Sequence, residues 1–235
     1  MAMLGLTAAE IEALQLSLKV GLVSACVSLP FAITVAMWLA RHDFPGKNLI
    51  DGIVHLPLVL PPVVVGYILL LLLGRRGPIG AWLDETFGVV VAFRWTGAAI
   101  AAAIMGFPLV VRAIRLSLEA SDRSLEAAAA TLGASRPWIF ITITLPLALP
   151  GVLSGSILGF ARALGEFGAT ITFVSNIPGE TRTLPIAIYT LTQIPGHEWA
   201  ALRLVIISVA LSIATLLASE RLARRVNRRI QGRDV

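Results

Sequence analysis

The chain has 235 residues, of which 57% are hydrophobic and 14% are charged, with a mean hydropathy of +0.84. Soluble domains carry about 25% charged residues, so the composition excludes an ordinary soluble protein and indicates one integral membrane domain, residues 1–235. The single cysteine, Cys26, excludes a disulfide within the chain, and the three histidines lack metal-ligand spacing. We therefore expect neither a metal site nor a cofactor in this chain.

Long uncharged runs predict an all-α membrane protein with about five transmembrane helices. A capping-box pattern at Thr7–Glu10 predicts a helix that starts before the first span. The first run is too long for a signal peptide and lacks a basic flank, so we expect it to be retained. We expect Pro57, Pro61 and Pro62 to kink or unwind the second span, and Pro108 to bend the third. The expected spans are residues 20–40, 49–73, 96–114, a run from about 147, and 200–219, with 74–94 and 175–199 as loops.

The distribution of Lys and Arg predicts the orientation. The loop 41–48, the segment 112–136 and the tail 220–235 together hold twelve of them, against four in the opposite loops. The positive-inside rule therefore places the central loop and the C-terminus in the cytoplasm and the N-terminus outside. We expect the basic tail to anchor at anionic lipid headgroups, which explains the pI near 10.3 without nucleic acid as a partner.

The polar stretch 118–146 lies between apolar runs and has the pattern of an ordered loop. Its Ala-rich run 126–132 has high helix propensity, and Ser121 or Asp122 can cap the helix start. Gly133 can end that helix in a left-handed conformation, and a proline four residues later prevents its continuation. The pattern predicts a short helix, a sharp turn and a second short helix at the membrane surface, suited to docking into another protein's groove.

This spacing resembles the cytoplasmic EAA loop of ABC-transporter permeases, in which EAA is followed by three residues, Gly, nine residues, Ile, one residue and Leu-Pro. The later part matches in full, whereas Ala127 stands where the motif has Glu, and Glu126 lies one place earlier. The resemblance implies a coupling helix that docks on an ATPase. The implied coupling residues are Glu126, Ala127, Ala128, Ala130, Leu132, Gly133, Ile143, Leu145 and Pro146. We expect apolar shape to matter more than charge here, so Glu126→Gln should disturb coupling less than Gly133→Val.

The sequence contains no G-x-x-x-x-G-K-[ST] phosphate loop, no G-x-S-x-G elbow and no H-E-x-x-H motif. We therefore do not expect an enzyme that hydrolyses ATP by itself. A membrane subunit with a docking helix and no nucleotide site must take its energy from a partner.

Two further stretches resemble the permeases of molybdate ABC importers. They are Phe160–Pro185, FARALGEFGATITFVSNIPGETRTLP, and His55–Tyr67, HLPLVLPPVVVGY. The resemblance implies a type I ABC-importer permease fold in the bacterial inner membrane and a homodimer. It also implies two cytoplasmic ATPases that bind ATP and Mg, and an external molybdate-binding protein. The implied function is import of molybdate or tungstate. A sulfate-type permease is an alternative, as is a self-standing channel or secondary transporter whose central loop is only a connector.

The fourth span carries two unusual features. Gly151, Gly155 and Gly159 recur every four residues, a pattern typical of close packing between membrane helices within or between subunits. Arg162 and Glu166 lie one helical turn apart among apolar residues, where unpaired charges are costly. We expect them to pair and to shape the anion path in the outer half of the membrane, with a purely structural pair as an equal alternative.

Four neutral polar residues after this pair are candidates for weak substrate contacts. They are Thr170, Thr172, Ser175 and Asn176. The alternative for each is an ordinary polar group at a helix end or in a loop, without contact to substrate. A tetrahedral dianion that was held tightly would not be released to the cytoplasm, so we expect only weak binding to the isolated permease.

Overall fold

The computed structural model describes residues 6–230, and within that range the chain is helical without any strand. This confirms the expected all-α class. The α-helices are α1 (Ala8–Arg41), α2 (Lys47–Val59), α3 (Pro62–Leu73), α4 (Pro78–Phe87), α5 (Trp95–Glu119), α6 (Ser124–Thr131), α7 (Arg136–Ile139), α8 (Leu145–Leu164), α9 (Gly168–Val174), α10 (Leu184–Thr192) and α11 (Glu198–Ile230), and a π-helix covers Phe140–Thr144.

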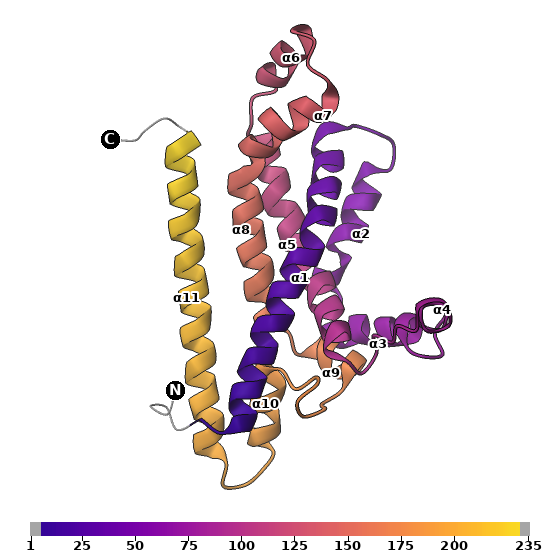
Figure 1. Cartoon of the computed structure of the whole chain (residues 1–235), viewed down its shortest axis with the longest axis vertical. Helices are drawn as coiled ribbons and strands as arrows, with labels where there is room; N and C mark the ends of the chain where they lie inside the picture. Colours follow the sequence, from indigo (N-terminus) through magenta and orange to yellow (C-terminus); the bar gives the residue numbers. More distant parts are fainter. Residues whose placement is uncertain (1–5, 231–235) are drawn as a thin grey trace.

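The long helices α1, α5, α8 and α11 run along the length of the molecule, as Figure 1 shows. Helices α6 and α7 lie at one end of this bundle, together with the last turns of α1 and the C-terminal part of α11. The start of α1, helix α10 and the start of α11 lie at the opposite end. We call these the α6 end and the α10 end. Helix α1 therefore begins at the α10 end, and α11 finishes at the α6 end.

Four helical segments are long and apolar enough to cross a membrane: Ala8–Arg41, Trp95–Glu119, Arg136–Leu164 and Glu198–Ala218. They cover four of the five expected spans, and each begins before the residue predicted for it, although Glu198–Ala218 ends one residue before the predicted end at 219. The remaining span is the pair α2 and α3, which bends by 109° and provides a fifth crossing only if the pair counts as one. The expected break within this span is thus confirmed.

Two consecutive prolines cause this bend. Pro62 is the first residue of α3 and has no N–H to continue the ladder of α2, while Pro61 before it has an extended ψ of 131°. Helix α3 then packs on α9, and the contact depends on Gly66, where a Cβ would lie 2.4 Å from the Ala169 carbonyl oxygen. Helix α3 consequently points away from the long helices, and α3 and α4 project to one side of the bundle (Figure 1).

Three sequence-based expectations about loops were wrong. Residues 74–94 are not only a loop, because they contain α4, which is capped by Gly88 at φ 64°. Residues 175–199 likewise contain α10, with Pro185 in its first turn. The helix after Gly133 is not a separate surface helix, because α7, the π-helix and α8 follow one another without a break. The fourth span therefore begins at about Arg136 and not near residue 147.

The glycine stripe of α8 packs against α5 within the same chain. A Cβ at Gly151 would lie 2.7 Å from the Ala113 carbonyl oxygen, and one at Gly155 would lie 3.1 Å from the Val110 carbonyl oxygen. A Cβ at Gly159 would lie 2.7 Å from a methyl group of Val110. Small residues therefore let the α5 and α8 backbones approach closely, which places the stripe inside the subunit.

Ion pairs hold the outer helices to this core. Arg203 of α11 donates to the buried carboxylate of Glu10 at 2.5 Å, and Glu10 also closes the expected capping box with Thr7. Arg115 of α5 donates to Asp51 of α2 at 2.9 Å. The tail 220–235 is helical as far as Ile230, and its last five residues lie outside the described range.

Candidate functional site

Helix α6 starts and ends through local hydrogen bonds. The Asp122 carboxylate accepts from the Ser124 N–H at 2.8 Å, and this backbone hydrogen bond lowers the pKa of Asp122. At the other end Gly133 has φ 86°, and the N–H groups of Gly133 and Ala134 donate to the carbonyls of Ala130 and Ala129. This pair of bonds is a Schellman motif, so Gly133 ends the helix as the sequence predicted.

Most of α6 is exposed at the α6 end of the bundle (Figure 1). Among its residues only Glu126 and Ala129, three positions apart, are half-buried and face the rest of the chain. The expected coupling residues Ala127, Ala128 and Ala130 are all exposed, as is Leu132, whose exposed fraction is 88%. Leu125 is exposed as well, and the family motif had not singled it out. Helix α6 therefore exposes small and apolar side chains at this end of the molecule.

Glu126 does not face outward. Its Oε1 accepts a hydrogen bond from Arg41 at the end of α1 at 2.5 Å, and another from the Thr144 hydroxyl of the π-helix at 2.8 Å. Arg123 adds a second link by donating to the Ala40 carbonyl at 2.7 Å. The sequence did not predict Arg41 and Thr144 as partners of Glu126. Arg41 is 85 positions and Thr144 18 positions away along the chain, and no local pattern links residues that far apart.

The later part of the motif lies at the start of α8 and not on α6. Ile143 lies in the π-helix, and Leu145 and Pro146 form the first turn of α8. Leu145 packs against the buried cluster that joins α1, α5 and α8. These residues therefore lie where the chain enters the bundle, whereas the exposed residues of α6 lie at its surface.

Arg162 and Glu166 form the expected pair, with Arg162 Nη1 2.7 Å from Glu166 Oε2. The Glu166 side chain is 1% exposed and that of Arg162 is 27% exposed. The other carboxylate oxygen of Glu166 accepts from the Ala169 N–H at 2.8 Å, in the first turn of α9. Glu166 therefore connects α8 to α9 and is more enclosed than a group that lines a water-filled path.

The neutral polar candidates do not converge on one point. The hydroxyl of Thr170 donates to the Phe167 carbonyl at 2.9 Å, and that of Thr172 donates to the Gly168 carbonyl at 2.8 Å. Asn176 instead accepts from Arg182 at 2.7 Å. Thr170, Thr172 and Asn176 therefore already have hydrogen-bond partners within the chain, and contact of these residues or of Ser175 with substrate stays a prediction.

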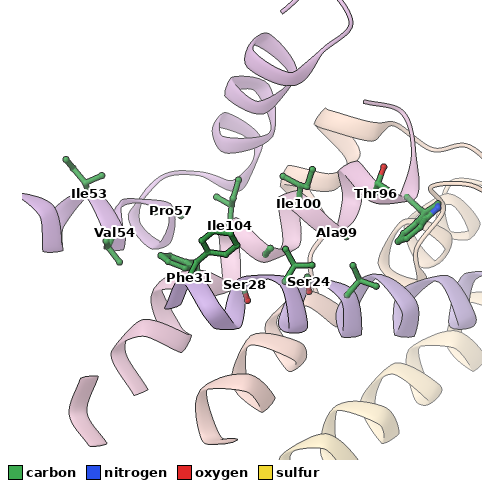
Figure 2. Close-up of a pocket in the computed structure, with 15 residues that line it drawn as sticks. Ser24, Ser28, Phe31, Ile53, Val54, Pro57, Thr96, Ala99, Ile100 and Ile104 are labelled. Carbon is green, nitrogen blue, oxygen red and sulfur yellow. The ribbon is translucent and has the colours of Figure 1, made fainter. Parts of the chain in front are cut away.

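An apolar groove of about 630 Å³ opens between α1, α2 and α5 (Figure 2). Its described lining contains no charged side chain. Of its hydroxyl groups, Ser24 and Ser28 donate to carbonyls of their own helix. The described lining of the groove therefore lacks the cations that recognise an oxyanion, and we do not assign substrate binding to it.

Comparison with known proteins covers nearly the whole chain. Residues 29–228 match the family model described as binding-protein-dependent transport system inner membrane component. The molybdenum transport system permease protein ModB of Escherichia coli K12 is 61% identical over 97% of this chain and 99% of its own length. ModB of Haemophilus influenzae is 58% identical over 94% of this chain and 96% of its own. The sulfate transport system permease protein CysW of Synechococcus elongatus is 36% identical over 91% of this chain and 76% of its own length.

Solved structures match the fold at low sequence identity. A bacterial alginate ABC transporter, in complex with a periplasmic protein that carries an alginate pentasaccharide, has a TM-score of 0.74 and 18% identity over 95% of this chain and 81% of its own. The inward-facing MetNI methionine ABC transporter has a TM-score of 0.67 and 15% identity, over 93% of this chain and 94% of its own. These matches confirm the expected type I ABC-importer permease fold.

Proposed function

The chain belongs to the family of binding-protein-dependent transport system inner-membrane components, and from this membership we propose that it is the permease subunit of an ATP-driven molybdate importer. The observation that supports molybdate as the substrate is the 61% identity to ModB of Escherichia coli, which extends over 97% of this chain and 99% of the relative. The sulfate relative is much more distant at 36% identity. Molybdate, with tungstate as a close chemical analogue, is therefore the preferred cargo over sulfate.

The energy for transport comes from separate ATPase subunits. The exposed small and apolar residues of α6 form a surface that fits a groove on such a partner, and the Schellman turn at Gly133 fixes the direction of the helix. ATP and Mg bind on the partner, and this chain contributes the docking element. The charge distribution supports a cytoplasmic location for the α6 end and an outside location for the α10 end. An external binding protein then delivers molybdate at the α10 end.

The oxyanion path forms between two copies of the chain. Support comes from the chemistry of the single copy, whose groove between α1, α2 and α5 has no charged lining to hold a dianion. Closure of the paired ATPases moves the two α6 helices and switches the dimer between inward-facing and outward-facing states. Weak neutral contacts along this path allow release, so the isolated permease should not bind molybdate at submicromolar concentration.

The test is ATP hydrolysis by the reconstituted complex of permease, ATPase and binding protein. We expect molybdate and tungstate, each loaded on the binding protein, to stimulate hydrolysis above the unstimulated rate, and sulfate to have no effect. Stimulation by sulfate alone would contradict the proposal and favour the sulfate-type alternative. Failure of the permease to copurify with any ATPase would instead favour a self-standing channel or secondary transporter.

A further inference from the structure

We propose that Glu126 is a positioning residue that ties the docking helix to the chain's own membrane helices through Arg41 and Thr144. We call Arg41, Glu126 and Thr144 the α6 clamp. The inference rests on the proposed function, because it concerns how displacement of α6 reaches the spans. It assigns Glu126 a role inside this subunit in place of a contact with the ATPase.

A single oxygen atom joins three elements in the clamp. Oε1 of Glu126 accepts from Arg41 of α1 at 2.5 Å and from the hydroxyl of Thr144 in the π-helix at 2.8 Å. The side chains of Arg41 and Glu126 are 13% and 23% exposed, and Thr144 is buried. Water therefore screens this charge pair less than an exposed pair, and hydrogen bonds that involve charged groups are the strong ones.

The clamp is important because α6 has few other connections. Helix α6 packs mainly on α7 and the π-helix, and most of its surface is exposed. Its direct link to α1 is the contact of Glu126 with Arg41, and two residues just before α6 add links to α1, because Ser121 accepts from Arg41 and Arg123 donates to the Ala40 carbonyl. Without the Glu126 contacts, α6 would keep its loop connections, its packing on α7 and the π-helix, and these two hydrogen bonds that precede it. A displacement of α6 would then move the loops on either side of it and would not reach α1 and α8.

The position of Thr144 strengthens the assignment. Thr144 is the last residue of the π-helix, and α8 follows directly. π-helical turns interrupt the regular hydrogen-bond ladder and occur frequently at functional sites. Glu126 therefore holds α6 to the irregular turn through which α8 leaves the α6 end. Displacement of the docking helix would reach α8 through Thr144 and α1 through Arg41.

These contacts revise the expectation that Glu126→Gln is mild. A glutamine keeps an acceptor oxygen but loses the charge that pairs with Arg41, so it should weaken the clamp, and Glu126→Ala should remove it. The coupling measurement is the ratio of substrate-stimulated to unstimulated ATP hydrolysis in the full complex. We expect Glu126→Ala and Arg41→Gln each to lower this ratio about fivefold, within the usual range for coupled sites. The ATPase should stay bound in each variant.

Non-additivity identifies the pair. If the two side chains act on each other, the double variant should be no worse than either single variant. Thr144→Val should lower the ratio, and Thr144→Ser should restore it because the hydroxyl remains. The matched control is Asp43→Asn, which breaks an exposed ion pair with Lys47 at the same end of the bundle. It should leave the ratio unchanged. Additive losses for Arg41 and Glu126 would overturn the proposal.

A second measurement needs no transported substrate, so it separates failure of the clamp from failure of the proposed function. In a Cys26→Ser background, spin labels at the exposed His42 and Thr131 report the distance between the end of α1 and α6. With the clamp intact we expect one narrow distance distribution in the permease–ATPase complex. Glu126→Ala should broaden it, and Asp43→Asn should not. An unchanged distribution in Glu126→Ala would overturn the clamp even if molybdate transport were normal.

Discussion

Three acidic residues, Glu10, Glu126 and Glu166, connect different helices. Glu10 joins α1 to α11, Glu126 joins α6 to α1 and the π-helix, and Glu166 joins α8 to α9. In each case the carboxylate combines an Arg partner with at least one further hydrogen bond. The Arg partner and the further hydrogen bond together offset part of the cost of placing a charge near hydrocarbon. The contacts of Glu166 favour the structural alternative for the Arg162 pair.

The first prediction follows from the burial of Glu166. Arg162→Ala leaves a carboxylate that is 1% exposed without its cation, so it should destabilise the solubilised permease by about 3 kcal/mol. Thermal unfolding in detergent measures this loss. Arg162→Met combined with Glu166→Gln should recover most of the stability, because glutamine can still accept from the Ala169 N–H.

The same double variant separates a path role from a structural role. If the pair only locks α8 to α9, the neutral variant should also transport molybdate at close to the normal rate. A stable variant that assembles and hydrolyses ATP without transport would show instead that the charges line the path.

At the scale of elements, local sequence decides where the docking helix stops and tertiary contacts decide how it is held. The turn at Gly133 has open space around it, since no neighbouring atom lies within 4 Å of the place that a Cβ would take. A substitution there therefore meets no steric clash and costs only the left-handed backbone conformation. The strain falls on the end of α6 and leaves the packing of the spans intact.

We predict that Gly133→Val disturbs coupling without preventing insertion. The left-handed conformation costs a non-glycine residue about 1 kcal/mol or more, and β-branching adds to it, so the last turn of α6 should fray. Loss of ATPase retention or of substrate-stimulated hydrolysis checks this. Gly46→Val is the matched control, because Gly46 has φ 92°, open surroundings and a place in another loop at the same end. Equal coupling in both variants would mean that α6 is not the docking element.

At the scale of the whole molecule, the path of the chain places the start of α1 and the end of α11 at opposite ends of the bundle. Helix α1 starts at the α10 end and α11 finishes at the α6 end, as Figure 1 shows, although α2 and α3 do not form a straight crossing. The geometry relates the ends to each other but contains no membrane, so the assignment of sides rests on the positive charges.

Two exposed histidines test that assignment. In a Cys26→Ser background, His197→Cys lies in the loop at the α10 end and His42→Cys follows α1 at the α6 end. A membrane-impermeant maleimide should label position 197 in intact spheroplasts and position 42 only after the membrane is permeabilised. Labelling in the reverse order would invert the proposed orientation and place the docking helix outside.

The sequence by itself determined the features that depend on neighbours along the chain. Apolar run length predicted the four long helices, and Gly133 predicted the end of α6. Pro57, Pro61 and Pro62 predicted a break in the second span, which falls at Pro61 and Pro62 while Pro57 stays inside α2. Each follows from local backbone chemistry or from transfer into hydrocarbon. Helices α4 and α10 escaped prediction because they are short, and their helical pattern was hidden by nearby glycines and prolines.

Only the tertiary structure decided what the polar groups do. Glu126 belongs to a recognisable motif, yet its partners Arg41 and Thr144 come from other helices. The glycine stripe of α8 was open to packing within or between subunits until α5 was seen against it. The periodicity of apolar residues indicates which face of a helix is buried, but it does not indicate which residues cover that face. The covering residues are distant in sequence and come close only when the whole bundle packs.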